Sequence, residues 1–377
     1  MKYKMAWPYF PDQEVDWLLG EFRQILDGTA MLSMGPRVKE FESLFSKYIG
    51  TDFAVGTNSC TAALEIALRS IDIQKNDEVI VPVETFVATA SAVVRENGTP
   101  IFCDIDSESY CLSFSEMRKK VTERTKAVIL VHMSGMISPD ALLIKEFCDK
   151  QNIILIEDAA HAPGASIDGI SAGAIGHMAC FSFYPTKIIT TAEGGMLVCS
   201  EQSIFDKADS YRNRGRDMAS QVEVYSRLGT NNRMTEMTAL LGISQMRCLD
   251  GFLKIRRSIA NVYNDRLNKI DVNSLVKPIN VSSNINHSYW RYIITLDPSI
   301  DREMIKYKLS SFGIQIDWAY YPPVHLQPYF VSEYGCKEGQ YPVAEDLLSR
   351  NICLPINPTM TIDDAEFVVN KFVESIT

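Results

Sequence analysis

The chain has 377 residues, of which 46% are hydrophobic and 22% are charged, so it has a globular balance and enough length for two domains. Its formal net charge of -10 argues against a nucleic-acid surface, but it leaves room for a local cationic pocket for a phosphorylated small molecule. No apolar run is long enough to cross a membrane, no signal-peptide core is present, and the nine cysteines form no CxxC pair. We therefore expect a cytoplasmic protein without membrane contact, disulfides or a metal site.

The first part of the chain predicts two amphipathic helices and a candidate anion site. The helices are expected at residues 12–27 and 40–48. A short strand at 53–56 then leads through Thr57 to Thr61 into a helix at 62–69. Free backbone N–H groups and the helix dipole make such a helix start suitable for an anion, although an ordinary Ser/Thr cap is the alternative.

From residue 79 onward, predicted strands alternate with helices. The strands are 79–83, 100–105, 127–133 and 153–156, and the helices are 85–97, 114–121 and 139–150. This alternation predicts an α/β fold, with a mostly parallel central sheet covered by helices on both faces as a three-layer sandwich. Ligands bind such sheets at the carboxyl ends of strands, and four notable segments fall there: 57–61, 84–86, 132–135 and 158–161.

Asp158 and His161 follow the apolar strand at 153–156. A carboxylate at the end of a buried strand is costly without a cationic partner, and a protonated pyridine nitrogen would be such a partner. The alternative is an aspartate that caps the next turn. His161 could hydrogen-bond a ligand oxygen or satisfy the loop backbone.

Lys187 lies in the middle of the stretch FSFYPTKIITTAEGGM, residues 181–196. A buried strand precedes it, and a second strand at 196–199 follows the Glu-Gly-Gly turn. A partly desolvated lysine on that connection would lose its proton easily, as Schiff-base chemistry requires, because only the neutral amine attacks a carbonyl. The alternative is a lysine on a surface loop.

The pattern of predicted helices and strands changes near residue 250. A helix at 202–212, an Arg-rich loop at 212–216 and a long helix after Glu236 come before this point. We interpret the Arg-rich loop as solvated, with phosphate binding as the alternative. Beyond residue 250 we expect helices at 251–269, 301–311, 343–349 and 361–375, and strands at 289–296, 314–317 and 352–354. The predicted division is a large domain at 1–250 and a smaller α+β domain at 251–377.

The order of several short motifs resembles that of pyridoxal-phosphate-dependent sugar aminotransferases of the DegT/StrS type, within fold type I. The motifs are Ser-x-Thr-Ala-Ala-Leu, Thr-Phe-Val-Ala-Thr, Glu-Asp-Ala-Ala-His, Phe-Ser-Phe-x-x-x-Lys, Glu-Gly-Gly and Asn-x-Arg-Met-x-Glu. The resemblance implies pyridoxal 5'-phosphate (PLP) bound covalently to Lys187, which also moves the substrate proton. It further implies that Asp158 keeps the pyridine nitrogen protonated and that His161 faces the ring.

The resemblance assigns further residues to the cofactor. Cys60 and Thr61 at the helix start, together with Ser182, match groups that hold the phosphate, and Phe86 matches an aromatic that stacks on the ring. Asn231 matches a residue that reaches the neighbouring subunit's cofactor, which implies a homodimer with shared sites. Arg233, Tyr321 and His325 are candidate substrate contacts, each with a structural role as the alternative.

The implied reaction moves an amino group from an amino acid, L-glutamate in most of the family, to a keto-sugar for surface polysaccharide. A nucleotide-linked sugar is expected, but the segment His132 to Met136 departs from the family's usual His-Leu-Tyr-Gly-Gln, so a small phosphorylated ketone stays an alternative. Cys60 and Ala192 replace glycines that are usual in the family. The same cofactor site would also suit a PLP-dependent lyase or dehydratase, or a PLP-binding regulatory relative without catalysis; the related dehydratases carry histidine where this chain has Lys187.

Overall fold

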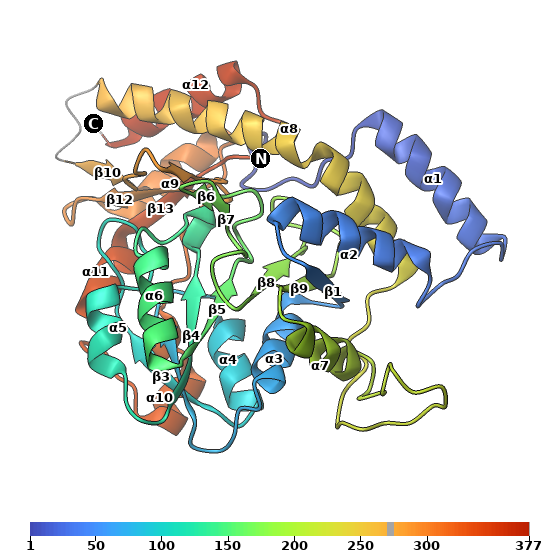
Figure 1. Cartoon of the computed structure of the whole chain (residues 1–377). Helices are drawn as coiled ribbons and strands as arrows, with labels where there is room; N and C mark the ends of the chain where they lie inside the picture. The colour runs from blue at the N-terminus through green and yellow to red at the C-terminus, as the bar shows by residue number, and fades with distance from the viewer. Residues whose placement is uncertain (270–274, 377) are drawn as a thin grey trace.

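A seven-stranded sheet forms the centre of the molecule (Figure 1). The computed structural model describes residues 1–269 and 275–376. The strand order is β1-β9-β8-β5-β4-β2-β3, and only β9 runs against its neighbours. The bounds are β1 (Phe53–Thr57), β2 (Glu78–Pro82), β3 (Thr99–Cys103), β4 (Thr125–Val131), β5 (Ile154–Asp158), β8 (Met178–Ser182) and β9 (Gly195–Cys199). The predicted mostly parallel sheet is confirmed.

Helices cover both faces of this sheet. Phe181 and Phe183 alternate with Ser182, so they face away from it. Phe41 and Phe45 of α2 (Pro36–Ile49) pack on these two rings, with centroids 4.8 to 5.3 Å apart. The N-terminal end of α3 (Cys60–Ser70) lies on the opposite face, beside Ser182. The other helices of this part are α1 (Asp12–Leu26), α4 (Val87–Arg95), α5 (Phe114–Lys120), α6 (Ala141–Gln151) and α7 (Gln202–Arg212).

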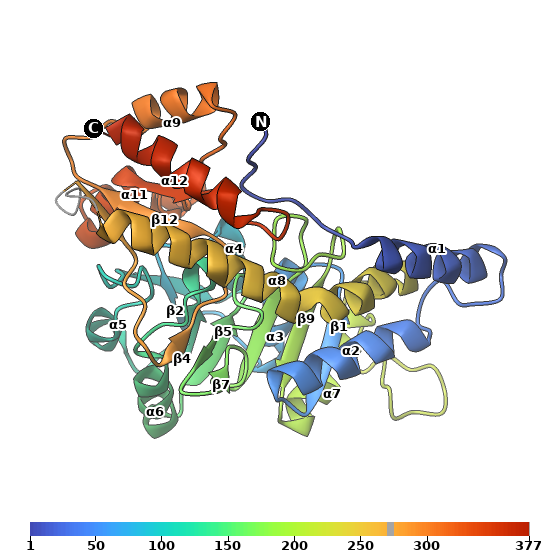
Figure 2. The ribbon, with the colours of Figure 1, turned by 90° about the horizontal axis from the view of Figure 1, so that it is seen from above.

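The long helix α8 (Glu236–Asn268) runs across the molecule from the region of α1 and α2 to the C-terminal part (Figure 2). It packs against α2 near its start and against α12 (Ile362–Ile376) further along. Helix is expected from the sequence on both sides of residue 250, and the structure joins the two stretches into one helix. The predicted boundary between residues 250 and 251 therefore falls inside α8, and the division into two domains stays a prediction.

The C-terminal part forms its own apolar cluster around an antiparallel sheet. The sheet order is β10 (Val276–Pro278), β12 (Tyr292–Leu296) and β13 (Asn351–Leu354). The helices are α9 (Arg302–Ser311), α10 (Pro328–Tyr334), α11 (Pro342–Arg350) and α12. The predicted strand at 314–317 is wrong, because Ile314 and Asp317 make only isolated bridges, to Tyr3 and Cys353. Among the described residues, no helix combines the length and apolar character needed to cross a bilayer.

Short elements complete the fold. A small sheet combines β6 (Ser166–Ile167), β7 (Ile170–Ser171) and β11 (Ile285–Asn286), and two 3-10 turns lie at Met133–Gly135 and Val324–Leu326. The first of these turns explains why β4 ends at Val131, before the predicted end at residue 133.

Candidate active site

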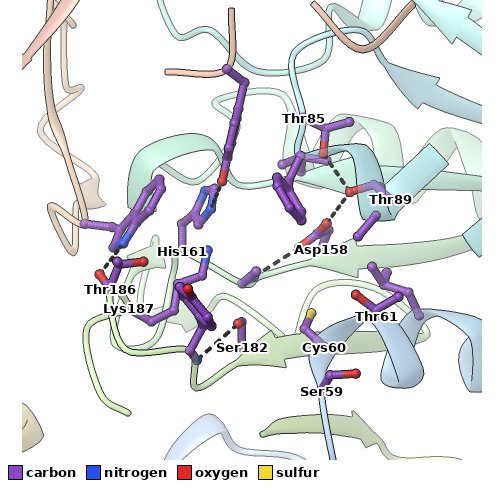
Figure 3. Close-up of a pocket in the computed structure, with 18 of the residues that line it drawn as sticks. Ser59, Cys60, Thr61, Thr85, Thr89, Asp158, His161, Ser182, Thr186 and Lys187 are labelled. Carbon is purple, nitrogen blue, oxygen red and sulfur yellow. Dashed lines mark hydrogen bonds between the residues drawn. The ribbon is translucent and has the colours of Figure 1, made fainter. Parts of the chain in front are cut away.

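A cavity of about 430 Å³ opens at the carboxyl ends of the central strands (Figure 3). Because β1 and β8 both run against β9, their carboxyl ends lie at the same edge as that of β5. Seven of the residues predicted from the sequence line this cavity: Cys60, Thr61, Phe86, Asp158, His161, Ser182 and Lys187. The sheet topology therefore brings together segments that are up to 127 positions apart in the sequence (60 to 187).

Lys187 lies on the connection between β8 and β9, and its side chain is directed into the cavity (Figure 3). A turn positions it, since the Lys187 N–H donates to the Tyr184 carbonyl at 2.9 Å. The pKa of Lys187 is lowered from 10.5 to about 8, chiefly by burial; Cys60 and Asp158 act in the opposite direction, and the Arg291 guanidinium adds to the lowering. The amine is therefore partly neutral near physiological pH, as a nucleophile must be.

Asp158 ends β5 and is almost fully buried. Burial raises the pKa of its carboxyl, while hydrogen bonds to the charged form lower it. Thr89 Oγ1 donates to Asp158 Oδ2 at 2.7 Å, and the Ala160 N–H donates to Oδ1 at 3.2 Å. Thr85 Oγ1 lies 2.7 Å from Thr89 Oγ1, so a chain of hydroxyl groups extends from the carboxylate. These contacts favour an ionised carboxylate that can hold a cationic partner.

His161 belongs to an aromatic wall on one side of Lys187. Its ring stacks on Trp290 with centroids 3.8 Å apart, and its Nε2 lies 3.0 Å from the hydroxyl of Tyr320. Burial lowers the pKa of His161 well below its usual value, and the charges of Lys187 and Arg291 lower it further. His161 is therefore neutral and offers a hydrogen-bonding ring rather than a charge.

The start of α3 provides the opposite end of the cavity. Ser59 caps the helix, since its Oγ accepts from the Ala62 N–H at 3.1 Å. The first N–H groups of a helix have no partners within it, so those of Cys60 and Thr61 are open to an anion together with the helix dipole. The Ser182 hydroxyl also lines this region. Figure 3 shows Ser59, Cys60 and Thr61 across the cavity from His161 and Thr186.

This set of groups fits PLP. A buried amine with a pKa of about 8 suits the aldehyde, and a buried carboxylate suits the ring nitrogen. The open helix start suits the phosphate. Phe86 lines the cavity, is 54% exposed and has its ring centroid 5.6 Å from that of Tyr320, so it provides an aromatic surface for stacking.

The structure does not bring four predicted residues to this cavity within one chain. His325 is fully buried against Tyr341, and its Nε2 lies 3.2 Å from Glu345 Oε1. This packing is typical of the structural role given as its alternative, and the substrate contact stays a prediction. Tyr321 points outward against Arg302, and Arg233 donates to Asn213 Oδ1 at 2.8 Å. Asn231 pairs with Asn213 at the base of the projecting segment between α7 and α8 (Figure 1), and its contact with a neighbouring subunit stays a prediction.

Several residues that line the cavity were not predicted from the sequence. Tyr320, rather than its neighbour Tyr321, faces the cavity. Thr89 could have been found, because it lies one helical turn after Thr85 at the predicted helix start. Trp290 and Arg291 come from the distant C-terminal part, and no local pattern marks them. Trp290 Nε1 donates to the Thr186 carbonyl at 2.7 Å, which joins that part to the loop of Lys187.

Comparison with known proteins gives consistent results. The DegT/DnrJ/EryC1/StrS aminotransferase family matches residues 13–373. The spore coat polysaccharide biosynthesis protein SpsC of Bacillus subtilis is 34% identical, over 90% of this chain and 89% of its own. The dTDP-4-dehydro-2,3,6-trideoxy-D-glucose 4-aminotransferase of Saccharopolyspora spinosa is 32% identical, over 92% and 90%. The crystal structure of an aminotransferase from Psychrobacter cryohalolentis has a TM-score of 0.91 and 27% identity, over 99% and 98%.

Proposed function

The chain belongs to the DegT/DnrJ/EryC1/StrS aminotransferase family, and from this premise we propose that it transfers an amino group from L-glutamate to a nucleotide-linked keto-sugar. The amino sugar would serve surface polysaccharide synthesis. The relatives support this choice, because one is named for a dTDP-linked 4-dehydro sugar and another for polysaccharide biosynthesis. In the balanced reaction, glutamate and the keto-sugar give 2-oxoglutarate and the amino sugar.

The observation that carries the proposal is the buried Lys187 amine in one cavity with Asp158 and the start of α3. Burial lowers the pKa of Lys187 to about 8, whereas a lysine in water would stay charged. A carboxylate and an open helix start in the same cavity supply the two other contacts that PLP requires. No one of these features is specific alone, but their combination is.

Bound PLP supplies an electron sink that stabilises the carbanion at the carbon bearing the amino group, and it carries the amine between the two half-reactions. We propose that Lys187 holds the cofactor covalently and, once released, moves the proton at the Cα of the donor. Asp158 would keep the ring nitrogen protonated, with Thr89 and the Ala160 N–H holding the carboxylate in place. His161 would orient the ring through its neutral imidazole.

The site is proposed to be completed by a second copy of the chain. The segment between α7 and α8 projects from the body of the molecule (Figure 1), and Asn231 at its base matches the residue expected to reach the partner's phosphate. Arg233, two residues further along, stays a candidate contact for the acceptor. A cytoplasmic location is proposed as well, since the cysteines are free thiols.

Nitrogen transfer tests the function directly. The purified protein is incubated with PLP, L-glutamate labelled with ¹⁵N, and a panel of dTDP-, GDP- and UDP-linked 4-keto-6-deoxy sugars, and the products are analysed by mass spectrometry. We expect the label in one sugar product, together with 2-oxoglutarate, and no product from Lys187→Ala. Transfer to a small phosphorylated ketone alone would identify the alternative acceptor. Product without glutamate would indicate a lyase, and PLP binding without any turnover would indicate a regulatory role.

A further inference from the structure

Arg291 is a cation in the cavity wall that has no anionic partner. It immediately precedes β12 and lines the cavity with Lys187, His161 and Tyr320. Its Nη1 is buried without a hydrogen-bond partner, and within residues 1–269 and 275–376 no carboxylate makes an ion pair with it. Leaving a buried N–H of a charged group unpaired is costly, so the arrangement is suited to a ligand that supplies an acceptor.

The position of Arg291 is fixed by a single indole ring that also contacts Lys187. The Arg291 guanidinium carbon lies 4.6 Å from the Trp290 ring centroid, and Lys187 Nζ lies 4.4 Å from it. The hydrogen bond from Trp290 to the Thr186 carbonyl holds this ring in the loop of Lys187. Arg291 is therefore held next to the reacting centre. Its charge also contributes to lowering the pKa of Lys187.

The cofactor phosphate is not the anion that this position fits. The open N–H groups of α3 lie at the other end of the cavity, and Figure 3 shows Ser59 and Cys60 on the side of Lys187 opposite to Thr186, which binds Trp290. The acceptor phosphates fit poorly too, because the sugar ring separates them from the keto carbon. The α-carboxylate of an amino acid, by contrast, is bonded directly to the carbon whose amine is transferred.

We propose that Arg291 binds the α-carboxylate of the amino-acid donor and so determines that the donor is an α-amino acid. This inference rests on the proposed function. The planar guanidinium matches a carboxylate in two parallel hydrogen bonds, and its stacking on Trp290 fixes the plane in which they form. The same contact would hold the 2-oxo acid until it leaves.

Equilibrium binding tests the proposal without turnover. The PLP-loaded protein is titrated with 2-methyl-L-glutamate, which has no Cα proton to lose, and with 4-aminobutyrate, which lacks the α-carboxylate; cofactor absorbance reports binding. We expect Arg291→Met to raise the Kd for 2-methyl-L-glutamate by about 30- to 100-fold and to leave the Kd for 4-aminobutyrate within about twofold, whereas Arg291→Lys has a smaller effect. Arg118→Met is the matched control, since it removes an exposed arginine from another aromatic ring.

Each different outcome overturns the proposal. If Arg291→Met raises the Kd for both amines by the same factor, Arg291 has a structural role. A higher Kd for PLP, or for UDP, GDP and dTDP, with unchanged binding of 2-methyl-L-glutamate assigns Arg291 to a phosphate. If the Met variant does not fold, the ratio of the Kd values for the two amines is measured in Arg291→Gln and Arg291→Lys instead, and it tests the proposal in the same way. A wild-type protein that binds neither amine refutes the proposed function itself, whereas wild-type binding with no change in the variants refutes only the role of Arg291.

Discussion

Lys187 is a weak base because its ammonium group is buried away from water. Burial is the largest cause, the nearby Arg291 acts in the same direction, and the resulting pKa is about 8. Asp158, also buried, has its pKa raised by desolvation, but hydrogen bonds from Thr89 and the Ala160 N–H favour its charged form. The two residues thus reach opposite roles, a partly neutral amine and a retained carboxylate, through their different partners.

The pH dependence of cofactor attachment follows from the pKa of Lys187. The neutral amine is lost as the pH falls below about 8, so the rate at which PLP attaches to the apoprotein should rise up to about pH 8 and then level off. Between about pH 8 and 10.5 the unfolded chain binds more protons than the folded one, so the apoprotein should become more stable across that window. Stopped-flow absorbance at several pH values measures the rate. An attachment rate that climbs steadily to pH 10.5 would contradict a lowered pKa.

Thr89→Val removes a hydrogen bond to the Asp158 carboxylate with little change in shape. Since that bond favours the charged form, the pKa of Asp158 should rise, and the carboxylate should be lost at a higher pH as the solution is acidified. We expect the acid limb of the glutamate half-reaction to move up by about one pH unit. Ser91→Ala, on the same helix, is the control. Identical acid limbs for the variant and the wild type would show that Thr89 does not act on Asp158.

The residues predicted from the sequence by their chemical type and their position at strand ends are the ones that line the cavity together. Lys187, Asp158 and His161 each follow a buried strand, so their place at the sheet edge is set locally. Tyr321 and His325, predicted as substrate contacts, do not line this cavity within one chain, because the direction of neighbouring side chains on a loop depends on tertiary packing. Arg291 carries no local signal at all, since its environment is formed by Trp290 and the distant loop of Lys187.

At the scale of elements, the contact between β9 and the start of α3 shapes the end of the cavity proposed for the phosphate. Gly195 begins β9, and a Cβ added there would lie 2.4 Å from the Ser59 carbonyl carbon and 2.5 Å from the Cys60 nitrogen. Backbone atoms cannot yield as a flexible side chain does. Glycine at 195 is therefore what allows the strand to approach the open N–H groups of the helix so closely.

Gly195→Ala should displace the start of α3. We expect a loss of about 1–3 kcal/mol in the free energy of unfolding and weaker PLP binding, measured by thermal unfolding and by titration of the apoprotein. Gly251→Ala is the matched control: it makes the same change inside α8, where nothing lies within 4 Å of the added Cβ. It should stabilise the protein by about 0.5–1 kcal/mol. Wild-type PLP affinity in Gly195→Ala would show that this contact does not shape the site.

The alternation of strands and helices predicted the central sheet well, because each element there has a strong apolar pattern. Short elements such as β6 and β7 were not predicted. Each has only two residues, too few to show an alternation of apolar and polar positions. The 314–317 stretch alternates apolar and polar residues as a strand does, yet its backbone pairs only at isolated points, with Tyr3 and Cys353. Local propensity could not reveal that missing partner strand.

At the scale of the whole molecule, α8 connects the central sheet to the C-terminal part, and the wall of the cavity draws on both. Arg256 in this helix is buried and donates to the carbonyls of Tyr289 and Ile356. The first of these immediately precedes Trp290 and Arg291 in the chain. Packing of the C-terminal part therefore determines where Trp290 and Arg291 lie relative to Lys187. Residues 1–250 alone would lack Trp290, Arg291 and Tyr320 of this wall.

The proposed homodimer with shared sites can be tested by mixing two inactive variants. Lys187→Ala and Asn231→Ala proteins, each nearly inactive alone, should regain roughly a quarter of wild-type activity after unfolding and refolding together, because half of the randomly formed dimers contain one intact site. The measurement is 2-oxoglutarate formation with L-glutamate and the active keto-sugar. Mixing Lys187→Ala with Asp158→Asn, which lie in the same subunit's site, is the control and should restore nothing. No recovery in the first mixture would place Asn231 in its own subunit's site or outside the site.

The most direct test of the proposed function is the absorbance spectrum of the PLP-loaded protein before and after addition of L-glutamate, beside Lys187→Ala. We predict a band of lysine-bound cofactor in the wild type that disappears with glutamate as 2-oxoglutarate forms, and no such band in the variant. A wild-type protein that carries the band but ignores glutamate and other amino acids would contradict the aminotransferase function. A protein that does not bind PLP would contradict the whole assignment of this cavity.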